Sequence, residues 1–225
     1  MTKPKPEPAQ PVVEIFEIDQ FEQGSPEWFN IRMGIPTASC FHIVMAVGRN
    51  GDASQTRARY MRVLAGEILT GRPGEGTKIV TAAMQRGIDM EPEALAYYEA
   101  RHFHMVRRVG FIRRQLPNGR WVGGSPDGLI GHHKGLEIKT MAPDLLIERL
   151  ERGSGMPAEH MAQVQGMMWL ADLEEMDVLL FYSDFPSCPK FTLRRNETYI
   201  RSLAHAVEVF DFELHQLVAK IRRMG

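Results

Sequence analysis

Apolar residues recur at three- and four-residue steps in two long stretches of the chain, the spacing of an amphipathic helix. The first stretch predicts a helix from about Gln55 to Thr70, which Gly71 and Pro73 then end. The second predicts one long amphipathic helix over Glu197–Arg223, the last part of the sequence. The chain therefore has at least two substantial helices, far apart in sequence.

Three further stretches have helical character. A short helix is expected from about Cys40 to Ala46, with Thr37 or Ser39 as its N-cap, and another from about Ala158 to Ala171. The stretch from Lys78 to His102 is also helical in pattern, but it contains Pro92. Because proline breaks helices, we expect one helix to end near Gly87–Met90 and a second to begin there.

The middle of the chain changes to short β-type patterns. The segments MVRRVGFIRRQ, RWVGGSPDGLIG and GLEIKT predict three short strands separated by turns, DVLLFYSDF predicts a buried strand, and KFTLRR an edge strand. The order of elements favours an α/β (α+β) fold, with a central mixed β-sheet flanked by helices. The first residues are Pro-rich, so we expect a flexible tail over residues 1–12 and a single domain over 13–225.

Composition narrows the class of protein. The 225 residues include 27 Lys and Arg against 28 Asp and Glu, a net charge of −1, which argues against a uniformly basic nucleic-acid coat or membrane anchor. No apolar run approaches the roughly 20 residues of a membrane-spanning helix, and no leader pattern precedes the domain. With only two cysteines, Cys40 and Cys188, a cytoplasmic location is expected.

Local charge differs from total charge. Residues 101–152 hold ten basic and five acidic side chains, and residues 30–62 hold five arginines and one aspartate. Phosphate contacts depend on local charge. A positively lined channel inside an acidic exterior is therefore compatible with the neutral total.

The most informative chemistry is Ser125-Pro126-Asp127-Gly128 followed by Glu137-Ile138-Lys139. Side chains alternate along a strand, so Glu137 and Lys139 share a face and Ile138 points the other way. If the two segments pair antiparallel through the intervening turn, Asp127 approaches Glu137. Two carboxylates beside an ammonium favour a hard cation such as Mg²⁺, with Lys139 polarising a water and its pKa lowered by the neighbouring cation. A surface hairpin with a simple charge pair has the same spacing.

These residues resemble the signature of the PD-(D/E)xK nuclease superfamily. The chain also resembles the lambda exonuclease and YqaJ-like viral recombinase family at five places in order: Trp28 with Arg32–Ser39, Gly87–Ala94 with Tyr98, Ser125–Gly128, Gly135–Thr140, and His160–Gln165 with Met168 and Trp169. Five matches in the same order over most of the chain are more specific evidence for the family than one short motif, which also occurs by chance.

The resemblance implies roles for particular residues. Two Mg²⁺ ions, with Mn²⁺ as an alternative, would be held by Asp127, Glu137 and the main-chain carbonyl of Ile138. Lys139 would orient or deprotonate the attacking water, and Glu91 would hold a metal-associated water from its helix, with Glu93 as a fallback.

Gln163 and Gln165 stand two apart on the predicted helix, so they cannot share a face. Only one of the two glutamines can face the site. From its place in the motif we expect Gln163, with a helix-surface role as the alternative.

Other matched residues concern the DNA. Arg32, Ser39 and Ser125 correspond to the family's pocket for a 5′-phosphate, because a guanidinium and hydroxyls supply donors to phosphate oxygens. Arg49 is a candidate DNA contact, with an exposed arginine as the alternative. Met84 is a candidate wedge at the terminal base pair, with a core methionine as the alternative.

The resemblance implies a Mg²⁺-dependent 5′-to-3′ exonuclease that acts on double-stranded DNA ends, releases mononucleotides and leaves a 3′ single-stranded overhang for phage-type recombination. It also implies a homotrimeric ring, a single-strand annealing protein as partner, and a phage or prophage gene in a bacterial host. The alternatives are a catalytically silent DNA-binding accessory protein and a related endonuclease.

Overall fold

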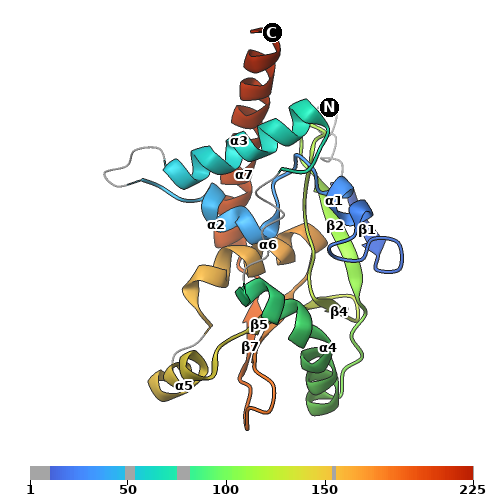
Figure 1. The fold of residues 1–225 in the computed structure, drawn as a ribbon, viewed down its shortest axis with the longest axis vertical. Helices are drawn as coiled ribbons and strands as arrows, with labels where there is room; N and C mark the ends of the chain where they lie inside the picture. The colour runs from blue at the N-terminus through green and yellow to red at the C-terminus, as the bar shows by residue number, and fades with distance from the viewer. Residues whose placement is uncertain (1–10, 49–53, 75–81, 154–155, 225) are drawn as a thin grey trace, which may run out of the picture.

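The computed structural model describes residues 11–48, 54–74, 82–153 and 156–224, except for the side chains of 82–84. After β1 the chain forms a run of helices and then four consecutive strands, and helices and strands follow in turn to its last helix (Figure 1). The strands are β1 (Val13–Glu17), β2 (Val109–Gln115), β3 (Trp121–Gly124), β4 (Gly128–Ile130), β5 (Lys134–Thr140), β6 (Glu175–Phe181) and β7 (Lys190–Arg194). The helices are α1 (Pro26–Ile31), η1 (Ala38–Cys40), α2 (Phe41–Val44), α3 (Gln55–Thr70), α4 (Ala82–His102), α5 (Pro143–Arg152), η4 (Ala158–His160), α6 (Met161–Ala171) and α7 (Glu197–Arg222).

The strands form two sheets. The first has the order β1-β2-β3 and is antiparallel throughout. The second has the order β4-β5-β6-β7, with β5 and β6 parallel and the outer pairs antiparallel. The expected mixed α/β architecture is confirmed, and its mixed sheet is the four-stranded one.

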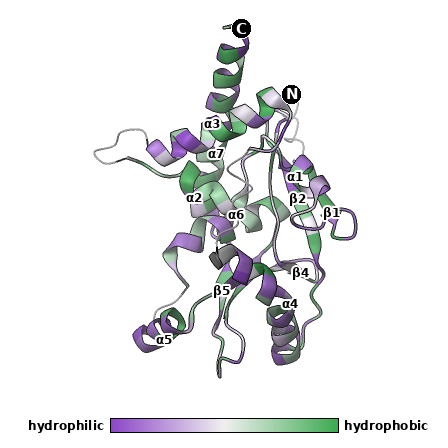
Figure 2. Ribbon diagram, in the orientation of Figure 1, coloured by the Kyte–Doolittle hydropathy of each residue, from purple (hydrophilic) through white to green (hydrophobic). Residues whose placement is uncertain are grey.

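Helices cover both faces of the four-stranded sheet. On one face α4 packs its buried Ala94, Leu95 and Tyr98 against Leu136 and Leu179 of β5 and β6. On the other face lies α6, which also touches β2 and β3 and so joins the two sheets. In Figure 2 α6 is mostly hydrophobic and α4 largely hydrophilic on the side seen, as their central and peripheral positions require.

The two helices that the apolar spacing predicts most clearly pack together. Helices α3 and α7 lie beside one another at the upper end of the molecule in Figure 1. Ser54 caps α3 and Asn196 caps α7, each accepting a hydrogen bond from a main-chain N–H of the first turn. Gly71 ends α3 in the left-handed conformation, as its place after Thr70 predicts.

The expected break at Pro92 is wrong, because α4 runs without interruption from Ala82 to His102. Proline removes the hydrogen bond to the carbonyl four residues earlier, that of Ile88. Ile88 is 58% exposed, so water can take the place of the missing donor. Burial of the opposite side of α4 then holds the helix together.

Two other expectations change. The segment expected as one strand from Arg120 to Gly131 is two strands in different sheets, β3 and β4, with Ser125–Asp127 as the link between them. Helix α5 is an addition that the apolar spacing did not indicate. Within the described ranges, no helix is long and apolar enough to cross a membrane.

Candidate active site

Strand β5 presents its side chains alternately to the two helical layers. Ile138 points into the apolar cluster under α4, together with Leu136. Glu137 and Lys139 point to the side of α6, where the Lys139 Nζ donates a hydrogen bond to the Glu137 Oε1 over 2.7 Å. Glu137 is only 3% exposed. The alternation expected from the sequence therefore places a buried carboxylate beside an ammonium.

Asp127 reaches the same point from the β3–β4 link. Its main-chain N–H donates to the carbonyl of Leu136 over 3.2 Å, and its Oδ2 accepts from the N–H of Ile138 over 2.5 Å. Gly128 permits this approach, because a Cβ at that position would lie 2.1 Å from Cγ1 of Val106. The antiparallel pairing of β4 with β5 thus brings the two carboxylates together, as expected.

Gln163 of α6 completes the group. Its Nε2 donates to the Glu137 Oε1 over 2.5 Å, and its Oε1 accepts from the Lys139 Nζ over 3.0 Å. Gln165 is 2% exposed and lies on another side of α6, where it bonds the carbonyl of Arg194 and the N–H of Asn196. The geometry therefore places Gln163, and not Gln165, next to the carboxylates.

Glu91 and Glu93 of α4 point in different directions. Glu91 forms an ion pair of 2.9 Å with Arg108, and its charge acts on Asp127. Glu93 accepts a hydrogen bond from Ser183 over 2.8 Å, beyond the end of β6. Of the two glutamates, the structure relates Glu91 to the carboxylate pair. Arg108 is a neighbour of this group that the sequence does not single out, because an isolated arginine belongs to no motif.

Burial and neighbouring charges shift the pKa values of Asp127 and Lys139. Burial and the nearby charge of Glu137 raise the pKa of Asp127 well above its usual range, and this outweighs the hydrogen bond from Ile138. Burial lowers the pKa of Lys139, but the charge of Glu137 and the hydrogen bond to it outweigh burial, so the pKa is raised. The expected lowering of the Lys139 pKa concerns a bound cation and stays a prediction, because the charges that raise this pKa are those of Glu137 and Asp127.

The donor set fits a hard divalent cation. The Glu137 Oε2 is buried without a hydrogen-bond partner in the described structure, next to the buried carboxylate of Asp127. Such an oxygen is costly unless a cation or water binds it. In the part of the chain that is described, no three His, Cys, Asp or Glu residues gather as a metal-binding group. Two carboxylates supplemented by carbonyl and water oxygens match Mg²⁺, which keeps several waters.

The residues expected to bind a phosphate are only partly brought together. The Arg32 guanidinium lies 4.0 Å above the centre of the Trp28 ring, and the Trp28 Nε1 donates to the Ser125 Oγ over 2.9 Å. Ser125 in turn donates to the carbonyl of Gly110 over 2.6 Å. Trp28 thus links Arg32 to the residue that begins the Asp127 loop. The hydroxyl of the exposed Ser39 lies 3.4 Å from that of Thr37, and within the described residues it forms no hydrogen bond with Ser125.

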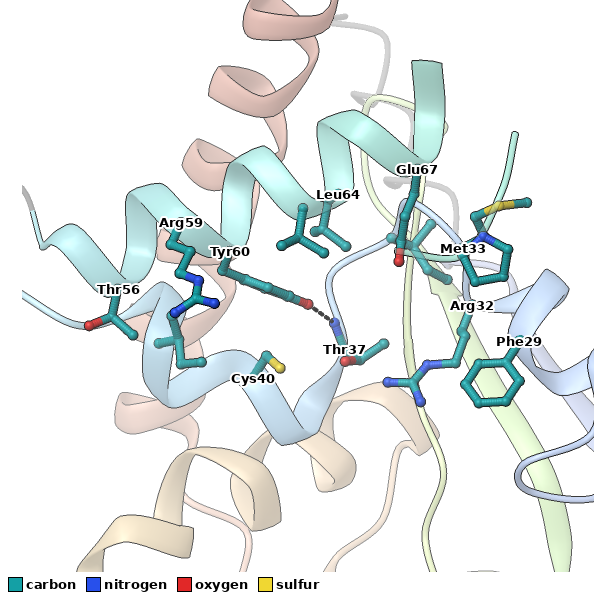
Figure 3. Close-up of a pocket in the computed structure, with 14 residues that line it drawn as sticks. Phe29, Arg32, Met33, Thr37, Cys40, Thr56, Arg59, Tyr60, Leu64 and Glu67 are labelled. Atoms are coloured by element: carbon teal, nitrogen blue, oxygen red, sulfur yellow. Dashed lines mark hydrogen bonds between the residues drawn. The ribbon is translucent and has the colours of Figure 1, made fainter. Parts of the chain in front are cut away.

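Arg32 also lines a pocket of about 300 Å³ between α3 and the segment that leads into η1 (Figure 3). Burial lowers the pKa of the guanidinium, while the charge of Glu67 opposes that effect. Among the described residues, no carboxylate forms an ion pair with Arg32. A half-buried cation with this surrounding is suited to an anionic ligand.

Two expectations cannot be placed. Arg49 and the side chain of Met84 lie outside the described residues. Trp28, which joins the Arg32 and Asp127 regions, is one of the residues that match the family, but the sequence alone assigns it no function. Its aromatic side chain beside Arg32 was a usable signal, since an arginine four residues after a tryptophan can stack on it within a helical turn.

A family model described as the YqaJ-like viral recombinase domain matches residues 27–174. Among curated proteins no sequence matches the chain. The solved alkaline exonuclease LHK-Exo from Laribacter hongkongensis is 29% identical, over 89% of this chain and 97% of that one, with a TM-score of 0.76. The same protein in complex with dAMP gives 30% identity over the same shares, with a TM-score of 0.77. A phage-related exonuclease from Haemophilus somnus, 15% identical over 86% of this chain and 99% of that one, has a TM-score of 0.60 and shares the fold.

Proposed function

This chain belongs to the YqaJ-like viral recombinase family of phage-type exonucleases, and we propose that it is a Mg²⁺-dependent 5′-to-3′ exonuclease acting on double-stranded DNA ends. It releases mononucleotides and leaves a 3′ single-stranded overhang for recombination. The observation that carries the proposal is the convergence of Asp127, Glu137, Lys139 and Gln163 on one buried point. Buried carboxylates with an orphan oxygen and an ammonium are the components of phosphodiester hydrolysis.

The reaction is the hydrolysis of the terminal phosphodiester. A water oxygen forms a bond to phosphorus, the bond from phosphorus to the 3′ oxygen breaks, and the 3′ oxygen leaves with a proton. When bound, Mg²⁺ ions supply Lewis acidity at the phosphate. Asp127, Glu137 and the carbonyl of Ile138 would hold these ions, and Mn²⁺ is an alternative.

The other residues orient the reactants. The Lys139 Nζ already donates to Glu137 and Gln163, so its remaining N–H can donate to the attacking water. Gln163 fixes Glu137 and Lys139 relative to each other, and Glu91 would orient water from α4. This division of roles places the positive Lys139 where negative charge develops at phosphorus.

Recognition of an end distinguishes an exonuclease from an endonuclease. Arg32, Ser39 and Ser125 would receive the terminal 5′-phosphate, with Trp28 holding Arg32 near the Asp127 loop. The dAMP complex of the relative from Laribacter hongkongensis supports a 5′-nucleotide as a ligand of this fold. Arg49 and Met84 remain candidates for a DNA contact and for the wedge that separates the terminal base pair.

The resemblance to the family also supports a proposal about assembly and setting. We propose a homotrimeric ring that encloses DNA, a single-strand annealing protein as partner, and action on DNA in the cytoplasm of a bacterial host. Apolar side chains on α5 support a subunit contact, because Leu145, Ile147 and Leu150 are each close to half exposed. Light scattering on the purified protein measures the oligomer, and a monomeric mass would contradict the ring.

The decisive experiment uses linear duplex DNA labelled at its 5′ or 3′ ends, with Mg²⁺ or with EDTA. We expect Mg²⁺-dependent early release of the 5′ label only. Asp127→Asn, Glu137→Gln and Lys139→Ala should each lower the rate at least about 100-fold, since each removes a group needed for the transition state. Circular dichroism should show that the variants are folded. Undiminished digestion by all three would refute the proposed site.

The same substrates separate the alternatives. A catalytically silent accessory protein would shift the duplex in a gel and release no nucleotides. A related endonuclease would cut closed circular DNA, which has no end for Arg32 to bind.

A further inference from the structure

The segment from Arg32 to Ser39 runs from the end of α1 into η1, and in the described structure its main chain pairs with β3 only at Pro36 and Thr37, opposite Gly123. Helix α3 supplies two side-chain acceptors to its main chain. The N–H of Gly34 donates to the Glu67 Oε2 over 2.8 Å, and the N–H of Thr37 donates to the Tyr60 hydroxyl over 3.1 Å. One anchor lies two residues after Arg32 and the other two residues before Ser39.

Glu67 is a buried carboxylate whose two oxygens both accept hydrogen bonds from main-chain N–H groups. It is 6% exposed, and its second oxygen accepts from the N–H of Gly74 over 3.0 Å. Hydrogen bonds from main-chain N–H groups to an ionised carboxylate are stronger than those between neutral groups. Gly34 itself has φ +73°, and a Cβ there would lie 2.6 Å from Cγ1 of Ile68. The segment therefore approaches α3 as closely as a glycine permits.

Helix α7 holds the Tyr60 side chain in place through an aromatic contact. Its ring stacks on Phe210 of α7, with ring centres 5.5 Å apart and planes 23° apart. Burial raises the pKa of the phenol, so the hydroxyl stays neutral, and its oxygen accepts from the N–H of Thr37. Figure 3 shows this hydrogen bond between Tyr60 of α3 and Thr37 of the Arg32–Ser39 segment. Arg32 lies farther along the same segment. The long C-terminal helix is thereby connected through Tyr60 to the Arg32–Ser39 segment.

We propose that Tyr60 and Glu67 are positioning residues for end recognition, which hold the Arg32 guanidinium and the Ser39 hydroxyl at the spacing that a terminal phosphate requires. This inference rests on the phosphate-binding role proposed above for Arg32 and Ser39. Neither Tyr60 nor Glu67 touches the phosphate. They act through the main chain of the segment between its two phosphate-binding side chains.

The test measures binding and does not need catalysis. Fluorescence anisotropy with EDTA present gives Kd for duplexes that differ only in a 5′-phosphate or a 5′-hydroxyl. Tyr60→Phe removes the acceptor of the Thr37 N–H with almost no change in shape. Glu67→Gln replaces one of the two oxygens that accept from Gly34 and Gly74 by an NH2 donor, so the side chain can no longer accept from both N–H groups. Loss of one such hydrogen bond should lower the preference for the 5′-phosphate about threefold to tenfold, with the Kd for the 5′-hydroxyl duplex unchanged.

Matched controls lose the same kinds of bond elsewhere. Tyr97 accepts from the N–H of Cys188 over 3.4 Å, and Glu99 accepts from the N–H of Val106 over 2.8 Å. Tyr97→Phe and Glu99→Gln should therefore keep the full preference for the 5′-phosphate. Gly34→Ala, which pushes the segment away from α3, is an independent variant expected to lose that preference.

The outcomes separate this inference from the proposed function. If Arg32→Gln loses the preference while folded Tyr60→Phe and Glu67→Gln keep it, the positioning role is wrong and the phosphate site stands. A wild-type protein with equal affinity for both ends overturns the inference. Absence of DNA hydrolysis by the wild type would instead contradict the exonuclease, while the binding preference would still report on Tyr60 and Glu67.

Discussion

The clearest residue-scale distinction is between two glutamines of α6. Gln163 bonds Glu137 and Lys139, whereas Gln165 bonds the main chain around Arg194 and Asn196. The same side chain thus orients charged groups in one position and ties α6 to the start of α7 in the other. Helical geometry forces this difference, since residues two apart point to opposite sides of the helix.

Alanine substitutions should separate the two roles. Gln163→Ala should lower kcat roughly 10–100-fold, as loss of a group that orients metal ligands does, with little change in stability. Gln165→Ala should lower the free energy of unfolding by about 1–3 kcal/mol, because it removes a buried side chain and its two partly buried hydrogen bonds to the main chain, and should preserve kcat. Steady-state kinetics and urea unfolding measure both. The reverse pattern would show that Gln165 faces the reaction.

At the scale of elements, α4 is fastened to the sheet by a buried carboxylate. Asp177 of β6, with no exposed surface, accepts from the Tyr98 hydroxyl over 2.6 Å, from Lys190 over 3.0 Å and from Thr192 over 2.5 Å. Tyr98 lies two turns after Glu91, on the same side of α4. The contact between Tyr98 and Asp177 therefore fixes the helix that carries Glu91.

Asp177→Asn should weaken this attachment in a pH-dependent way. Burial acts to raise the pKa of Asp177, but hydrogen bonds from Thr192, Tyr98 and Lys190 outweigh burial and lower it below its ordinary 3.8. A lowered pKa in the folded state stabilises the protein above the unfolded pKa, and that stabilisation is lost as pH falls through the folded value. The variant should therefore lose about 1.5–3 kcal/mol at pH 7 and less near pH 3.

Urea unfolding of wild type and variant across this pH range makes the comparison. Asp89→Asn, which changes an exposed carboxylate on α4, is the control and should have little effect at any pH. A loss of stability from Asp177→Asn that does not change with pH would contradict the assigned ionisation.

At the scale of the whole molecule, the carboxylate pair links metal binding to folding. Burial and the nearby charge of Glu137 raise the pKa of Asp127 in the folded protein, whereas in the unfolded chain the two carboxylates are solvated and separate. A cation that binds only the folded state stabilises it according to its concentration relative to Kd. Metal binding is therefore measurable as stability, without any DNA.

Mg²⁺ at about 100 times its Kd should add roughly 2.7 kcal/mol to the free energy of unfolding. For a chain of this length that raises Tm by about 5–10 °C relative to EDTA. Differential scanning fluorimetry measures the shift. The double variant Asp127→Asn, Glu137→Gln is the control and should show almost no shift, so an equal shift in both proteins would mean that the ions bind elsewhere.

Some features of this fold and site were predictable from the sequence, and others became visible only in the structure. The strand alternation of Glu137, Ile138 and Lys139 was predictable because neighbouring side chains on a strand point to opposite faces. The helices α3 and α7 were predictable from the spacing of their apolar residues. The continuity of α4 through Pro92 was not, since burial of Ala94, Leu95 and Tyr98 against the sheet outweighs the local cost of proline.

The sequence by itself determined the local periodicities, the motif residues and, through them, the family and the identity of the carboxylate pair. Only the tertiary structure decided which of two glutamines meets Glu137, that Trp28 joins Arg32 to Ser125, and that Tyr60 and Glu67 hold the Arg32–Ser39 segment. The physical reason is that sequence patterns describe short-range structure, whereas these contacts join residues far apart in the sequence. Periodicity reports which face of its own element a side chain occupies, but hydrogen bonds between distant segments depend on how those elements pack.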